Sequence, residues 1–237
     1  MKTGDRSRDE MGHAWLQVVA PTVDPDPRIA LQEAVMLRRL QKYPADVTAH
    51  YNLGALYQTQ NRNAQAIEQY RSALQADPSR AAARNALGTV LLADGRNSDG
   101  MGELKETVRK DPGYSPAHFN LARALTGVDD REGAVREYTT YLKQQPDDAQ
   151  ANLNLAAIYI GLRRFDLALP HYERACEIAP DANTLTDLGT LYEKTSKLSE
   201  AIKAFQKALE LDPENEIARK NLAQATSPLQ SQSPRVP

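Results

Sequence analysis

The chain has 237 residues, with 29 Lys or Arg and 31 Asp or Glu side chains, so its formal net charge at pH 7 is -2. This balance does not favour binding to nucleic acid or to an anionic membrane, because the chain as a whole has no field that attracts a polyanion. Its single cysteine, Cys176, can form neither an internal disulfide nor a cysteine-based zinc site, which excludes the secreted disulfide-stabilised class.

The N-terminal segment does not resemble a secretory signal. Residues 1–10 mix basic and acidic side chains with no net charge, and the apolar stretch 14–20 is short and is followed by Pro21. No stretch approaches the run of about 18 apolar residues that spans a membrane. We therefore expect a cytoplasmic protein without membrane insertion. Residues 1–27 are expected to be poorly ordered, because the Asp-Pro-Asp-Pro run at 24–27 blocks regular structure.

Residues 28–46 are expected to form an N-terminal capping helix or a degenerate repeat. Pro44 ends a pattern of apolar residues at helical spacing. These apolar residues are Ile29, Leu31, Ala34, Val35, Leu37 and Leu40. We expect them to cover the open face of the element that follows.

A period of 34 residues runs through the middle of the chain. It is marked by Pro78, Pro112, Pro146, Pro180 and Pro213, which follow one another at intervals of 34, 34, 34 and 33 residues. Alignment on these prolines divides the chain into five units, 47–80, 81–114, 115–148, 149–181 and 182–215, with one residue deleted between the fourth and the fifth. Positions below are counted from the first residue of each unit.

Each unit is predicted to form two helices joined by a turn. The first unit shows the pattern in the residues Leu53, Gly54, Tyr57, Ala66, Tyr70 and Ala73. Their spacings are those of two apolar helix stripes, in which small residues allow close approach of the backbones and an aromatic residue fills the adjacent groove. Helix starts are predicted at the N-caps Asp46, Asp148, Asp181 and Ser115, the last followed by Pro116.

This pattern resembles the tetratricopeptide repeat family, whose unit is a helix-turn-helix of 34 residues. The resemblance covers residues 47–215 and implies an all-α, right-handed superhelical solenoid of five such repeats, with a concave and a convex face. Residues 216–226 are expected to form a C-terminal capping helix, and 227–237 a flexible tail rich in Ser, Gln and Pro.

Two departures from the family pattern stand out. The aromatic residue usual at position 4 is replaced by His50, Arg84, His118, Asn152 and Leu185. The second unit has Gly100 and Gly102 in its second helix, each expected to cost about 1 kcal/mol relative to alanine. We therefore expect the second unit to be the weakest of the array.

The sequence contains no motif for catalysis, a cofactor or a metal. Its histidines are scattered, and no HExxH, nucleophile elbow, Walker loop or GxGxxG occurs. His50 and His118 occupy equivalent positions two units apart, about 20 Å at the usual helix spacing, and therefore cannot share a metal ion. Cys176 aligns with apolar residues of the other units, which indicates a small core residue. We expect neither enzymatic activity nor a cofactor.

The candidate binding surface is the concave face, which positions 2, 5, 6, 9, 12 and 13 of the first helices are predicted to line. Position 6 carries Asn52, Asn120 and Asn154, whose amides can grip a peptide backbone or only bond the neighbouring helix. Tyr51 and Phe119 at position 5 offer apolar contact or interhelical packing, and Arg123 at position 9 offers a partner for a carboxylate or remains solvated.

The residues favour a non-catalytic interaction scaffold that binds a partner polypeptide in its concave groove. Resemblance to chaperone-binding members would imply a carboxylate clamp, but no unit has a basic residue at position 2, 5 or 6, so we expect no such ligand. The alternative is that the array recognises substrates for a larger enzyme similar to the O-linked N-acetylglucosamine transferases. Self-association is compatible with both.

Overall fold

The computed structural model describes residues 26–230, and the expectations for residues 1–25 and 231–237 lie outside this range. The described residues form twelve helices and no strand. The helices are α1 (Pro27–Lys42), α2 (Val47–Thr59), α3 (Asn63–Ala76), α4 (Ala81–Ala93), α5 (Asn97–Lys110), α6 (Ser115–Gly127), α7 (Arg131–Gln144), α8 (Ala149–Gly161), α9 (Phe165–Ile178), α10 (Ala182–Lys194), α11 (Leu198–Leu211) and α12 (Glu216–Gln230).

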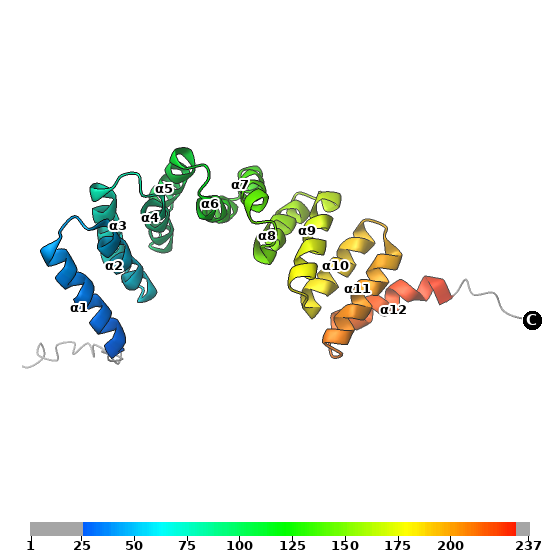
Figure 1. Ribbon diagram of the computed structural model, residues 1–237. Helices are drawn as coiled ribbons and strands as arrows, with labels where there is room; N and C mark the ends of the chain where they lie inside the picture. The colour runs from blue at the N-terminus through cyan, green and yellow to red at the C-terminus, as the bar shows by residue number, and fades with distance from the viewer. Residues whose placement is uncertain (1–25, 231–237) are drawn as a thin grey trace, which may run out of the picture.

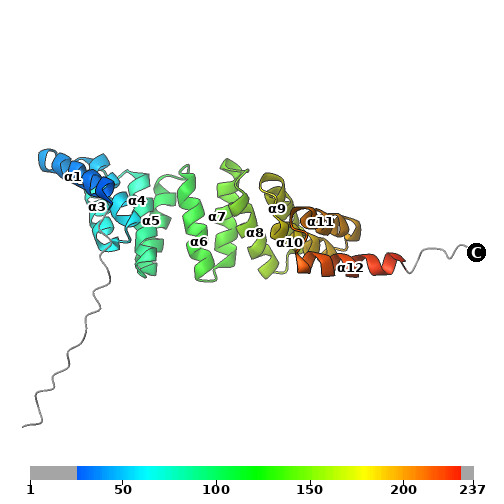
Figure 2. The same cartoon turned by 90° about the horizontal axis from the view of Figure 1, so that it is seen from below.

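These helices form an arched, all-α solenoid, which confirms the predicted fold class (Figure 1). Figure 2 shows them side by side in one row, with α1 and α12 at opposite ends. Each first helix packs on the second helix of its own unit and on that of the preceding unit. First helices also contact one another at α2–α4, α4–α6 and α10–α12, whereas the second helices within residues 26–230 make no comparable contact. The first helices therefore line the inner, concave side of the arch.

The helix boundaries follow the sequence period closely. The first helices begin at Val47, Ala81, Ser115, Ala149 and Ala182, which are the first residues of the five units. The residue missing between the fourth and fifth units is removed from a loop, since residues 179–181 join α9 to α10 whereas residues 77–80 join α3 to α4. The deletion thus leaves both flanking helices intact.

The core is a series of clusters between neighbouring helices instead of one central cluster. Position 24 supplies the large buried side chains Tyr70, Tyr138 and Phe205, and small residues such as Ala66 and Ala73 are completely buried beside them. Gly54 and Gly189 allow this packing, because a Cβ atom would lie 2.8 Å from the Tyr70 ring at the first and 2.4 Å from the Phe205 ring at the second. Contacts between successive units therefore replace a globular core.

The second unit departs from this arrangement in a way that changes the expectation for Gly100. Position 24 is occupied by Leu104, which is smaller than the aromatic residues of the other units, and α4 and α5 approach closely. A Cβ atom on Gly100 would lie 2.7 Å from the carbonyl oxygen of Gly88 and 3.0 Å from the amide nitrogen of Leu92. Alanine does not fit there, so Gly100 serves the packing. Gly102 is exposed, and its Cβ would meet nothing within 4 Å.

Helix termini show which predicted caps are correct. Asp46 Oδ1 accepts from the Ala49 amide, Asp148 Oδ1 from the Ala151 amide, both at 2.9 Å, and Asp181 caps α10 in the same manner. The prediction for Ser115 is wrong, because Tyr114 is the N-cap residue of α6 and Ser115 is already helical. Pro116 thus occupies the first turn, where its missing N–H has no intrahelical partner to lose.

Within each unit, the turn between the two helices places one residue in the left-handed region. This residue is at position 15 of every unit: Asn61, Gly95, Asp129, Arg163 and Ser196, with φ between 58° and 79°. Only Gly95 adopts this conformation without strain, although Asn and Asp tolerate it better than other side chains do. The sequence pattern did not reveal this position, because its residue types vary.

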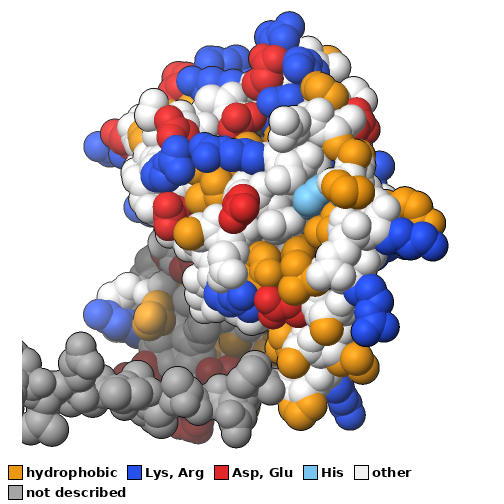
Figure 3. All heavy atoms as spheres, turned by 90° about the vertical axis from the view of Figure 1, so that its left-hand side faces the viewer, with side chains coloured by type: hydrophobic (Ala, Val, Ile, Leu, Met, Phe, Trp, Pro, Cys, Tyr) orange, Lys and Arg blue, Asp and Glu red, His pale blue; other side chains and the backbone are white. Residues whose placement is uncertain are grey.

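The two terminal helices differ in detail from the expected caps. Helix α1 packs on α2 with Met36 and Leu40, while Leu31 and Val35 are 66% and 59% exposed. Figure 3 views this end of the array, where hydrophobic side chains lie among lysine and arginine side chains. Helix α12 continues to Gln230, past the end expected at residue 226, because a proline removes only its own backbone donor and does not always stop a helix. None of the helices within residues 26–230 could cross a membrane.

Candidate functional site: the concave groove

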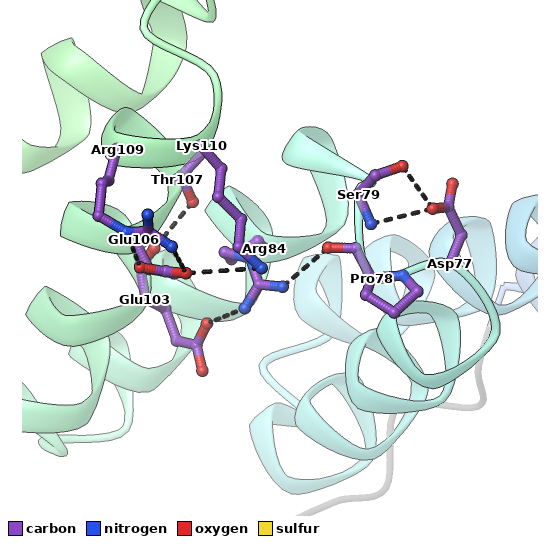
Figure 4. Close-up of polar contacts among 9 residues, drawn as sticks. All are labelled: Asp77, Pro78, Ser79, Arg84, Glu103, Glu106, Thr107, Arg109 and Lys110. Atoms are coloured by element: carbon purple, nitrogen blue, oxygen red, sulfur yellow. Dashed lines mark hydrogen bonds and ion pairs between the residues drawn. The ribbon is translucent and has the colours of Figure 1, made fainter.

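Side chains at position 4 form polar bridges inside the units, here called position-4 bridges. In the first four units, this side chain reaches the carbonyl of the proline six residues earlier and a polar side chain at position 23 of the unit, on the second helix. In the second unit, Arg84 donates to Glu103 at 3.0 Å and to the Pro78 carbonyl at 2.9 Å (Figure 4). The loop, the first helix and the second helix are thereby joined by one side chain.

The same bridge recurs with different chemistry. His50 joins Gln69 to the Pro44 carbonyl, and Asn152 joins His171 to the Pro146 carbonyl. His118 has Nδ1 2.6 Å from Glu137 and Nε2 3.0 Å from the Pro112 carbonyl. The fifth unit has the apolar pair Leu185 and Ala204 at these two positions, both buried. Position 4 therefore couples the helices of a unit, which accounts for His50, His118 and His171 without a metal ion.

Burial of His171 gives the array a dependence on pH. The ring donates to Asn152 Oδ1 at 2.9 Å and stacks on Tyr159, and desolvation lowers the pKa of His171 below its usual value. The imidazole of His171 therefore binds a proton more readily in the unfolded chain than in the folded one. The stability that neutral, buried His171 contributes is fully present above about pH 6.5 and is lost as pH falls through the folded-state pKa. Between pH 7 and pH 5, we expect wild type to lose more unfolding free energy in urea titrations than His171→Gln, which keeps an amide donor. Equal losses would contradict this assignment.

Cys176 is a core residue, as the alignment of units predicted. Its side chain packs with Leu185 and Leu188 between α9 and α10, and burial raises the pKa of the thiol to about 11. A thiol that stays protonated at neutral pH is a poor nucleophile. No cluster of His, Cys, Asp or Glu suited to a metal ion occurs among residues 26–230.

The concave face is hollowed on both sides of α6. A cleft of about 520 Å³ lies between α4, α5 and α6, and Leu92, Met101 and Val128 contribute apolar surface to it. A second cleft of about 530 Å³ lies between α6, α7 and α8, with Tyr138 and Ile158 in its wall. We call these the first and the second hollow. Both are lined by Arg123 and Gly127, so they adjoin along α6.

Arg123 is the predicted site residue that the structure places most centrally. Its side chain is exposed, and it forms no ion pair or hydrogen bond with any residue in the described part of the chain. It lies close enough to Tyr138 to oppose the rise in the pKa of that phenol, which is caused mainly by burial. Its guanidinium group is thus available for a ligand between the two hollows.

The three asparagines of position 6 do not behave alike. Asn120 lines the first hollow and donates to Asn85 of α4 at 3.0 Å, while Asn154 lines the second hollow and donates to the Tyr138 hydroxyl at 3.0 Å. Gln150 also donates to Asn154. Asn52 is exposed and lines neither hollow. Two of the three amides therefore already join neighbouring helices.

Tyr51 and Phe119 lie away from both hollows. The ring of Tyr51 is 5.8 Å from that of Tyr70, and the ring of Phe119 is 5.2 Å from that of Tyr141 and 5.8 Å from that of Tyr138. Both rings are partly buried and pack against the clusters of the core. They stabilise contacts between helices, and their outer edges remain accessible.

Several residues of the hollows were not among the predicted site residues. Leu92 and Gly127 stand at positions 12 and 13, which the helical wheel had assigned to the groove, but neither an aliphatic side chain nor a glycine indicates a binding site in a sequence. Met101 belongs to a second helix and Val128 to a turn, so a wheel of the first helices does not find them. The site is therefore built from more elements than the sequence pattern indicated.

Comparison with known families agrees with the architecture. A family model described as tetratricopeptide repeat matches residues 51–115, and another with the same description matches residues 147–214. Together they include more than half of the chain.

One curated protein and several solved structures are similar to this chain. Sperm-associated antigen 1 of Mus musculus is 34% identical over 76 residues, which are 32% of this chain and only 8% of that protein. The crystal structure of YrrB, described as a TPR protein with an unusual peptide-binding site, has a TM-score of 0.65 at 18% identity and covers 78% of this chain and 96% of its own. A crystal structure of MamA has a TM-score of 0.61 at 24% identity, with 81% and 98% covered. These two likenesses establish the fold.

Proposed function

The chain belongs to the tetratricopeptide repeat family, and from this premise we propose that it is a cytoplasmic, non-catalytic scaffold that holds a partner polypeptide in its concave groove. Proteins of this family are in general interaction scaffolds without catalytic activity. The observation that carries the proposal is the pair of adjoining hollows around Arg123, which are open on the concave face. Preformed concavity with apolar walls and a few polar groups is the usual form of a binding site.

The groove offers both kinds of contact that a peptide needs. Apolar side chains of the hollows can contact apolar side chains of the peptide. The exposed amide of Asn52 and the remaining hydrogen-bonding capacity of the Asn120 and Asn154 amides can bond to the peptide backbone. Tyr51 and Phe119 can add apolar surface away from the hollows, through the parts of their partly buried rings that stay accessible. The matches do not favour the alternative of a substrate-recognition array within a larger enzyme.

The proposal is tested by blocking the groove without disturbing the fold. Gly127 lines both hollows, and a Cβ at this position meets nothing within 4 Å, so Gly127→Tyr places a ring in the groove. Gly102→Tyr is the matched control, because Gly102 is equally open but lines neither hollow. We expect proteins captured from a host lysate by wild type and by Gly102→Tyr to be lost with Gly127→Tyr.

Equal helicity of the three proteins by circular dichroism ensures that the comparison concerns binding alone. Partners that remain on Gly127→Tyr would place the binding surface outside the groove and contradict the proposal. This design is preferable to replacing Asn120 and Asn154, because their removal would also break the bonds to Asn85 and Tyr138.

A further inference from the structure

The groove of the first four units is almost free of charge. At positions 2, 5, 6, 9, 12 and 13 of α2, α4, α6 and α8, every side chain is uncharged at neutral pH except that of Arg123. Two charged residues outside these positions, Asp129 and Arg131, also line the second hollow, where they pair with each other at 2.7 Å. Other acidic and basic side chains of these units pair away from both hollows, as Arg84 does with Glu103 and Arg164 with Glu132. Among the described residues that line the two hollows, Arg123 is therefore the charged side chain without a partner of opposite charge.

The position of this charge relative to the hollows is equally specific. Arg123 lies on the shared border of the first and second hollow, and each hollow has apolar side chains beyond it, with polar side chains beside them. The apolar side chains are Leu92, Met101 and Val128 in the first hollow and Tyr138, Ala157 and Ile158 in the second. Helices pack about 8–10 Å apart, so the hollows, which lie on either side of α6, are separated by roughly that distance or a little more. The order along the groove is apolar, positive, apolar.

From this order, and on the basis of the proposed function, we propose that the groove selects an extended segment with one acidic residue and an apolar residue two positions before and after it. In an extended chain, side chains at i−2, i and i+2 point to the same side, and four residues span about 13 Å. The outer two side chains then enter the hollows while the carboxylate meets the guanidinium group of Arg123.

The chemistry of Arg123 fits a single carboxylate better than another acceptor. Its planar guanidinium group can donate two parallel hydrogen bonds to the two carboxylate oxygens, and it has no competing acidic partner among residues 26–230. Burial of the pair under the ligand strengthens the contact, because the surrounding groove is neutral and partly apolar. A segment with several acidic residues gains little further, since Arg131 in the second hollow already pairs with Asp129 and donates to the Gly161 carbonyl.

Selection from a random library tests this inference with a defined probe. Linear dodecapeptides displayed on phage are selected against the full chain, against Arg123→Gln and against Gly127→Tyr. On wild type we expect enrichment of one Asp or Glu with apolar residues two positions to either side. On Arg123→Gln the acidic preference should disappear while the apolar preference remains, and peptides selected on wild type should bind this variant about tenfold more weakly.

The outcomes separate this inference from the proposed function. One outcome is that the selected peptides fail to bind Gly127→Tyr but show no preference for an acidic residue. Another is that the acidic preference persists on Arg123→Gln. Either outcome would overturn the motif and leave groove binding intact. Selected peptides that bind Gly127→Tyr as well as wild type, or no enrichment at all, would contradict groove binding itself. Arg123 is exposed, so loss of folding is not expected, and circular dichroism of each variant verifies this.

Discussion

Gly100→Ala should destabilise the array, whereas Gly102→Ala, two residues further along the same helix, should stabilise it. At Gly100 the added methyl group would meet the backbone of α4 at 2.7 Å, so α4 and α5 must move apart, which we expect to cost about 1–3 kcal/mol of unfolding free energy. At Gly102 the methyl group meets nothing, and the higher helix propensity of alanine should add about 1 kcal/mol. Urea unfolding monitored by circular dichroism measures both changes.

A second substitution in the same unit provides the control. The first unit combines Gly54, Ala66 and Tyr70, so Gly100→Ala together with Leu104→Tyr gives the second unit the same three residue types beside Gly88. The double variant should recover much of the stability that Gly100→Ala loses, because the larger ring sets the helices further apart. Stabilisation by Gly100→Ala alone would show that α4 and α5 are not in close backbone contact.

The helical hairpin and its period could be predicted from the sequence, whereas the packing of Gly100 could not. Spacing of small and large apolar residues is repeated five times, so errors at one residue do not obscure the helical hairpin or its period. The expected cost of Gly100 left out the close packing of α4 against α5. The helix propensity of glycine is a property of that residue alone. The space available at Gly100 depends on the approach of α4 to α5, where Gly88 lies against Leu104 and Gly100.

The candidate site was predictable only in part, and the reason is again geometric. The helical wheel assigned Arg123 to the groove because position 9 faces away from the buried stripe of α6. The wheel contains no information on neighbouring units, so it did not show that Asn120 bonds to Asn85 or that Asn154 bonds to Tyr138. It also could not place Met101, which reaches the hollow from α5.

The polar residues at position 4 were recognised as departures from the family pattern, but their partners were not. Each partner stands 19 residues later, on the second helix, and varies in type among Gln69, Glu103, Glu137 and His171. The combination of the two residues differs in every unit, and in the fifth unit both are apolar. Pairing of this kind is visible in the sequence only after the helices have been placed side by side.

His118→Leu should therefore destabilise the array strongly, by about 2–3 kcal/mol. The substitution leaves the Pro112 carbonyl without its partner and leaves the carboxylate of Glu137, whose side chain is only 21% exposed, facing an apolar residue. Adding Glu137→Ala should recover more than half of this loss, because the pair then matches Leu185 and Ala204 of the fifth unit, which pack without a polar bridge.

The four proteins of this double-mutant cycle isolate the coupling between the two helices, with Glu137→Ala alone as the fourth member. Unfolding free energies from urea titrations should give a coupling of at least about 1 kcal/mol, as expected for groups in direct contact. Additive effects would mean that His118 acts mainly through the Pro112 carbonyl, and the bridge would then hold the loop instead of joining α6 to α7. A strong coupling would establish that His118 and Glu137 join the two helices of the third unit, where the first, second and fourth units place contacts of different chemistry at the same positions.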